Sequence, residues 1–210
     1  MALAYIPAST TSLIFYIYPL ATTLLAMLVF KLRPGRIIWL AMGLIGLGCG
    51  LIFHDAFAQA LDIRGIFYAL ACMAFFSLYL TLIQVFTRTD EARRLSPWVI
   101  MCMALVFTIL SPPTRVMDYG LEGLAVALGL GFIPTALAVT LLYKAVSEIG
   151  SAYAAIFSSI EPAATVLLAS LVLGEAVAWP QLAGMSAIIL GIVLPNLRLA
   201  RQHARMRDKG

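Results

Sequence analysis

Charge is scarce in this sequence, and its scarcity excludes most classes of soluble protein. Asp, Glu, Lys and Arg together make up 11% of the 210 residues, while hydrophobic residues make up 62% and the mean hydropathy is +0.99. Soluble globular chains carry about 25% charged residues. The composition therefore excludes a soluble enzyme, a disordered chain and a nucleic-acid-binding protein, and it predicts an integral membrane protein.

Residues that carry enzyme or metal chemistry are also few. The three cysteines lie singly in apolar stretches, so they form neither a zinc-ligand spacing nor a disulfide framework. The sequence has no HExxH pair, no phosphate-binding loop, no Gly-x-Ser-x-Gly motif and no CxxC motif. We therefore expect no enzyme activity, no metal site and no bound cofactor.

Long stretches without charge define the predicted membrane spans. A helix needs about 20 apolar residues to cross the hydrocarbon core, and backbone in lipid must satisfy its own hydrogen bonds. The seven predicted spans cover residues 6–30, 37–54, 65–86, 96–111, 123–144, 150–173 and 178–197. The sequence thus predicts an all-α membrane protein with about seven transmembrane helices in contact with membrane lipid.

Basic residues are distributed unevenly over the loops between these spans. Seven spans place twelve Lys and Arg residues on one side of the membrane and two, Arg64 and Arg115, on the other. Because Lys and Arg concentrate in cytoplasmic loops, the N-terminus is predicted outside and the C-terminus in the cytoplasm. This fits a multi-pass protein of the cell (inner) membrane. It also explains the net charge of +4 without a nucleic-acid partner.

The chain repeats itself in a register that aligns position 17 with position 160. Residues 17–29 and 160–172 are identical at nine of thirteen positions, and this repeat register continues without a gap to Gly48 and Gly191. One repeat contains five spans, so the two copies insert in opposite senses. Inverted repeats of this kind are typical of secondary transporters.

The repeat also predicts how the chain is organised. Three segments follow: 1–56 as the last two helices of a first repeat, 57–197 as a complete second repeat, and 198–210 as a basic cytoplasmic tail. The spans that would complete the first repeat are not represented. We therefore expect an N-terminally shortened form of a ten-span protein, through either a real truncation or a misplaced start.

Motifs in both copies resemble the EamA-type branch of the drug/metabolite transporter superfamily. They are Tyr18-Pro19-Leu20, Leu142-Tyr143-Lys144-Ala145, Gly150-Ser151-Ala152-Tyr153-Ala154, Glu161-Pro162 and Leu173-Gly174-Glu175. The resemblance implies a transporter that exports amino acids, related metabolites or drugs by alternating access, with a cavity between its repeats. A non-transporting remnant or an accessory subunit of such a transporter is the alternative, and a homo-oligomer remains open.

Glu161 is the only acidic residue inside a predicted span, and the only other charge within the spans is Lys144 at the cytoplasmic end of the fifth. At 1.5 Å per residue it lies about 16 Å deep, where a carboxylate costs about 2.5–3.5 kcal/mol on insertion scales. One interpretation is a group that binds a solute amine or couples transport to protons. The other is a hydrogen-bonded Glu that braces a neighbouring helix. The matching residue in the first copy is Tyr18, so the fold does not require a charge at this position.

Aromatic residues inside the spans are further candidates for the solute pathway. Phe76 and Tyr79 belong to an aromatic stripe in the third span, and Tyr16 and Tyr18 lie in the first span. Large aromatic side chains at helical spacing can face a cavity, but they also pack against lipid or neighbouring helices. Both interpretations stay open for these four residues.

Prolines and glycines complete the set of unusual positions. Pro19, Pro134 and Pro162 remove helical hydrogen bonds, so they are either gating hinges or fixed kinks. The segment from Gly46 to Gly50 has the spacing of small residues that lets helices approach closely. We expect these glycines to pack against another helix, and we expect the same of Gly184 and Gly191.

Overall fold

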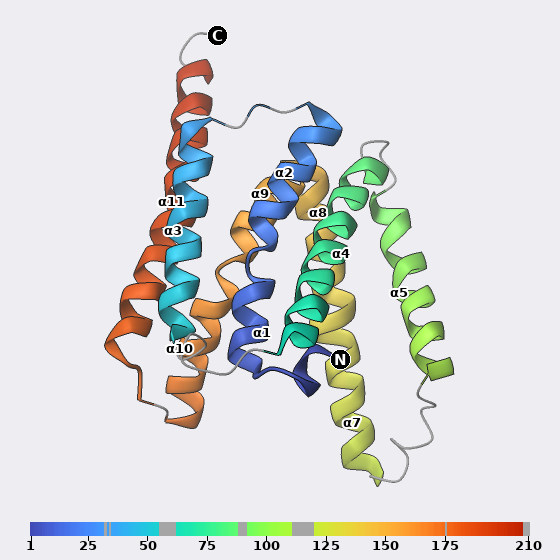
Figure 1. Ribbon diagram of the computed structural model, residues 1–210. Coiled ribbons are helices and arrows are strands. Elements are labelled where there is room, and N and C mark those ends of the chain that lie inside the picture. The colour runs from blue at the N-terminus through green and yellow to red at the C-terminus, as the bar shows by residue number, and fades with distance from the viewer. Residues whose placement is uncertain are drawn as a thin grey trace. The chain divides into compact units, whose positions relative to one another are not determined.

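The computed structural model describes residues 1–31, 33, 35–54, 62–87, 92–110, 120–174 and 176–207, and it describes side chains in these ranges except 92–95 and 196–207. Arg115 and Glu175, named above, lie outside the described residues. Every regular element in the described residues is a helix (Figure 1). The predicted all-α membrane fold is confirmed.

Seven apolar helices in this part of the chain correspond to the seven predicted spans. By length and composition, four can cross a membrane, namely Ala8–Phe30, Ile63–Thr87, Gly120–Ile149 and Ser151–Leu173. The shorter apolar helices are Arg36–Ile52, Ser96–Leu110 and Trp179–Pro195. The charge-free stretches therefore predicted the helices well, because backbone in lipid must satisfy its own hydrogen bonds and a helix does so.

The first span is broken into two helices, α1 (Ala8–Phe15) and α2 (Tyr18–Phe30). The sixth span is broken in the same way, into α9 (Ser151–Ser158) and α10 (Glu161–Leu173). All four pairs of helix ends match in the register of the sequence repeat. In both copies a proline is the second residue of the later helix. Since proline has no backbone N–H, it cannot donate a hydrogen bond back across the break.

The ends of the two broken spans also match. Lys31 and Gly174, which the repeat register aligns, both end their helix in the left-handed conformation, with φ of 52° and 71°. Glycine adopts this conformation without strain, whereas lysine adopts it rarely. The first copy therefore keeps the helix end although it carries Lys31 in place of glycine.

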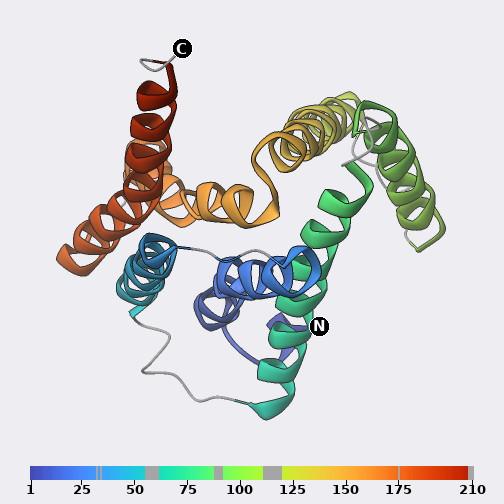
Figure 2. The same ribbon diagram turned by 90° about the horizontal axis from the view of Figure 1, so that it is seen from above.

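Helices α3 (Arg36–Ile52) and α11 (Trp179–Arg207) lie side by side, as the two views agree (Figures 1 and 2). Gly48, Gly184 and Gly191 pack at their contact, where an added Cβ would lie within 3 Å of the opposite helix. The prediction that these glycines pack is confirmed. The same prediction for Gly46 and Gly50 is wrong, because a Cβ on either would meet nothing within 4 Å.

The chain divides into two compact units. The first comprises Met1–Thr81 and Ala155–Gly210, and it contains the 3-10 turn η1 (Ala2–Ala4), α1, α2, α3, α10, α11 and most of α4 (Ile63–Thr87). The second comprises Leu82–Ala154, and it contains α5 (Ala92–Leu110), α7 (Gly120–Leu130), the π-helical segment η3 (Gly131–Leu137) and α8 (Ala138–Ile149). The candidate site lies in the first unit.

Polar side chains bind elements together within the second unit. Gln84 Oε1 accepts hydrogen bonds from the Ser151 backbone N–H at 2.9 Å and from the Ser151 hydroxyl at 2.6 Å. This amide therefore caps the start of α9, where backbone N–H groups have no partner inside the helix. The hydroxyls of Ser96 and Thr140 lie 3.5 Å apart between α5 and α8.

Candidate functional site

Aromatic rings gather around the break between α1 and α2. The Tyr18 ring contacts Phe76 edge-on at a centroid distance of 5.0 Å, and Phe15 lies 5.3 Å from both rings. Tyr79 continues the cluster at 6.0 Å from Phe76. The break thus brings residues of the first and third spans into one aromatic cluster.

Tyr18 is the buried centre of this cluster, with 1% of its surface exposed. Its hydroxyl donates a long hydrogen bond of 3.4 Å to the Ala155 carbonyl in α9. The Ser77 hydroxyl in α4 lies 3.3 Å from the Tyr18 carbonyl and 2.9 Å from the Met73 carbonyl of its own helix. This burial favours the packing interpretation for Tyr18.

Tyr16 lies inside the break itself and is only partly buried. Its ring stacks on Phe53 at 5.7 Å, with an interplanar angle of 15°. The Tyr16 hydroxyl lies near the Glu161 carboxyl. Of the two tyrosines, only Tyr16 is therefore partly exposed.

Glu161 is the first residue of α10, and its side chain is exposed although Pro162 and Ala163 behind it are buried. The partial positive charge at the start of a helix stabilises a carboxylate there. Because of the repeat, Glu161 takes the same place after its break that Tyr18 takes after the other. The two helix breaks thus each place one side chain with a polar group next to the aromatic cluster.

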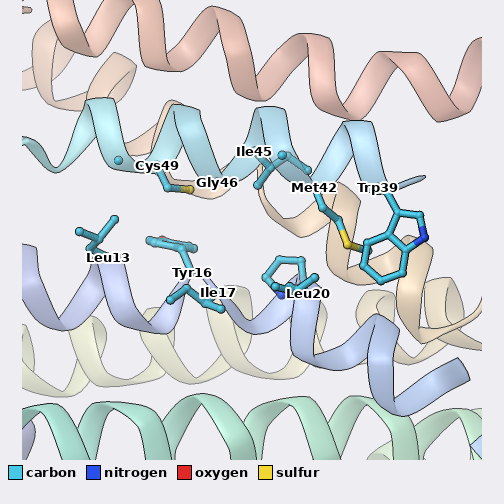
Figure 3. A pocket seen from close by; sticks show the side chains of 12 residues that line it. Leu13, Tyr16, Ile17, Leu20, Trp39, Met42, Ile45, Gly46 and Cys49 are labelled. Carbon is cyan, nitrogen blue, oxygen red and sulfur yellow. The ribbon is translucent and has the colours of Figure 1, made fainter. Parts of the chain in front are cut away.

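A cavity of about 510 Å³ lies between the α1–α2 break and α3 (Figure 3). Leu13, Tyr16 and Leu20 line it on one side, and Trp39, Met42 and Cys49 line it on the other. None of the residues that line it carries a charge. We call this cavity the break groove.

The structure brings five predicted pathway residues into one connected group, namely Tyr16, Tyr18, Phe76, Tyr79 and Glu161. Their role in a pathway stays a prediction. Pro19 and Pro162 follow the two breaks directly, whereas Pro134 is exposed within η3 in the other unit. Among the described residues, no three His, Cys, Asp or Glu side chains are grouped as metal ligands.

Phe15, Phe53 and the break groove were not predicted from the sequence. A signal for the groove was present, because Gly43, Gly46 and Gly50 are spaced by three and four residues and share one helix face. No comparable signal existed for Phe53. It follows α3 directly and meets Tyr16 only through the fold.

The family model of the EamA-like transporter family matches residues 1–54 and 63–197. The chain belongs to the EamA-like transporter family. This places the seven apolar helices of the EamA-like chain in a multi-pass membrane protein, and the resemblance inferred from its motifs is confirmed.

Two curated relatives of the EamA-like chain are 27% identical to it. The uncharacterized transporter YwfM of Bacillus subtilis aligns over 84% of this chain and 60% of its own length. The uncharacterized transporter sll1319 of Synechocystis aligns over 93% and 61%. The EamA-like chain thus spans about 60% of the length of these relatives.

A solved crystal structure supports the fold. It superposes on 96% of the EamA-like chain and 71% of its own chain, with a TM-score of 0.76 and 18% sequence identity. At this identity the likeness concerns the fold alone.

Proposed function

We propose that this chain transports small organic solutes across the cell (inner) membrane, as an exporter of amino acids, related metabolites or drugs. The observation that carries the proposal is the pair of matched helix breaks with Glu161 and the aromatic cluster beside them. Broken helices at the interface of inverted repeats form substrate sites in several transporter folds. The segments 1–56 and 57–197 are the two repeats in this proposal.

Alternating access gives each part of the cluster a task. The breaks before Pro19 and Pro162 let each half-helix tilt separately, so a solute between the repeats faces one side of the membrane at a time. Lipid surrounds the apolar helices. The many exposed apolar side chains leave surface for a second copy of the chain without requiring one.

Glu161 couples transport to protons in this proposal. A carboxylate at this depth is stable when it holds a cation or a proton, because an unpaired charge in the bilayer is costly. Solute amine and proton then compete for one carboxyl group. Exchange of one for the other drives export as protons enter down their gradient.

Solute efflux from cells that express the chain tests this function. The cells are loaded with labelled amino acids and compared with cells carrying an empty vector, with and without a proton uncoupler. We expect efflux above the vector level that the uncoupler abolishes. Glu161→Gln is expected to abolish it as well, because the amide cannot exchange a proton.

Glu148→Gln is the matched control. Glu148 is 63% exposed near the end of α8, where its carboxyl lies 4.0 Å from the Lys144 ammonium, so its loss is expected to leave efflux unchanged. An equal loss of efflux in both variants would show that the effect comes from removing any acidic charge and is not specific to Glu161. No efflux across the panel from membrane-inserted protein would contradict the transport proposal.

A further inference from the structure

The break groove is hollow because three glycines of α3 face it. Gly43, Gly46 and Gly50 all line the groove. A Cβ built on any of them would meet nothing within 4 Å, so the missing side chains are replaced by open space and not by another helix. These glycines therefore differ from Gly48 on the same helix, whose Cβ would lie 2.6 Å from the Gly184 carbonyl oxygen.

The internal repeat provides a comparison for these glycines. In the repeat register, Gly48 matches Gly191, and both glycines pack at the contact of α3 and α11. The three groove glycines instead match Ser186, Ile189 and Val193. The fold therefore needs glycine at the packing position in both copies, whereas it does not need the groove glycines. The hollow is a property of the first copy alone.

The groove has the size and the walls of a site for an organic ligand. Its volume of about 510 Å³ lies within the range of about 300–1,000 Å³ that is usual for small-molecule pockets. Its walls suit an apolar body, and the rings of Tyr16 and Trp39 can face a cation.

Charge is available at the wall that Tyr16 forms. The Tyr16 hydroxyl lies near the carboxyl of Glu161, which is exposed and is the only acidic residue within the predicted spans. An ammonium group complements this carboxylate, whereas a lipid acyl chain or an apolar helix offers it no partner.

We propose that the break groove binds the apolar body of an amphipathic organic amine while Glu161 and Tyr16 hold its ammonium group. This rests on the proposed transport function and names the class of its solute. The apolar body sets affinity by filling the space over the three glycines. The ammonium group sets selectivity, because it replaces the proton on the only carboxyl group near the groove within the spans.

Direct binding to the purified full chain in phosphatidylcholine nanodiscs tests the proposal. Trp98→Phe and Trp179→Phe leave Trp39, on the groove wall, as the single tryptophan reporter. The probe is 4-phenylbutylamine, and its neutral counterpart is 4-phenylbutanol. We expect a saturable change in Trp39 fluorescence with the amine, at an affinity at least tenfold higher than that of the alcohol.

Two further variants separate the charge from the space. Glu161→Gln is expected to weaken binding of the amine at least tenfold and to leave the alcohol unchanged. Gly46→Leu fills the groove and is expected to weaken both ligands at least tenfold. Gly129→Leu is its matched control, because Gly129 lies on α7, is not among the residues that line the groove, and also has open space around its Cβ position. Circular dichroism and gel filtration verify that each variant is folded.

Three results would overturn the inference. Equal affinity for amine and alcohol would make the groove an apolar site of the kind an acyl chain fills. Unchanged binding in folded Gly46→Leu protein would show that the ligand does not occupy the groove. The absence of a saturable response would show that the chain has no such binding site. Efflux of other solutes without amine binding defeats only this inference, whereas amine binding without any efflux defeats the proposed transport function.

Discussion

Gly48 and Gly184 face each other where α3 crosses α11, and a Cβ added to either would lie 2.6 Å from the carbonyl oxygen of the other. Gly191 approaches the Ala41 carbonyl oxygen in the same way, at 2.9 Å from its Cβ position. The repeat register exchanges Gly48 with Gly191 and Ala41 with Gly184. The two ends of this crossing are therefore equivalent, as a two-fold axis between inverted repeats requires.

This crossing predicts opposite effects for two neighbouring glycines. We expect Gly48→Ala to lower the free energy of unfolding by about 1–3 kcal/mol, because the methyl group has no room against α11. Gly46→Ala meets open space and is expected to be neutral or to stabilise by up to about 1 kcal/mol. Unfolding of the purified variants in detergent measures both free energies. Equal values for the two variants would contradict the close contact of Gly48 with α11.

Tyr18 is predicted to act through its ring more than through its hydroxyl. The ring is almost fully buried, whereas its interhelical hydrogen bond of 3.4 Å is long. Tyr18→Phe is therefore expected to cost about 0.6 kcal/mol or less. Tyr18→Ala is expected to cost about 3–5 kcal/mol through the cavity that it leaves. A phenylalanine variant as unstable as the alanine variant would show that the hydroxyl is the important group.

Gln84 is predicted to hold the start of α9. Gln84→Leu keeps most of the side-chain volume but removes both hydrogen bonds to Ser151, so we expect a loss of about 1 kcal/mol. Amide hydrogen exchange at residues 151–154 is expected to become faster. Gln181→Leu is the control, because Gln181 accepts the Ala178 N–H at the start of α11 and should leave residues 151–154 unchanged.

The helix breaks predict a separation of binding from transport. Pro162→Ala restores an N–H that can bond across the break, so α9 and α10 are expected to stiffen into one helix. Efflux is then expected to fall several-fold while amine binding stays within about twofold of the original value. Pro97→Ala within the unbroken helix α5 is the control. An equal fall in both variants would argue against a hinge at Pro162.

The charge distribution predicts the orientation of the chain. Single cysteines are introduced at Lys31 and at Arg64 in a chain whose three cysteines are replaced by alanine. A membrane-impermeant thiol reagent added to intact cells is expected to label position 64 and not position 31, because basic loops stay in the cytoplasm. Labelling at position 31 alone would show that the chain has the opposite orientation in the membrane.

The sequence by itself determined where the helices are and which positions of the two copies correspond. Lipid allows only backbone that satisfies its own hydrogen bonds, so charge-free stretches translate directly into helices. Pro19 and Pro162 each remove an N–H next to a break, but Pro97 does the same inside the unbroken helix α5, so a proline alone does not decide where a span breaks. The repeat register likewise predicted which elements would match.

Only the tertiary structure decided which face of each helix meets a neighbour. Gly46 and Gly48 have the same local chemistry, yet Gly48 packs on α11 and Gly46 borders the break groove. Tyr16 and Tyr18 differ in the same way: Tyr16 lies inside the break, where helical periodicity no longer sets its direction. Periodicity places a residue on a face, but only long-range packing determines whether that face meets a helix, lipid or open space.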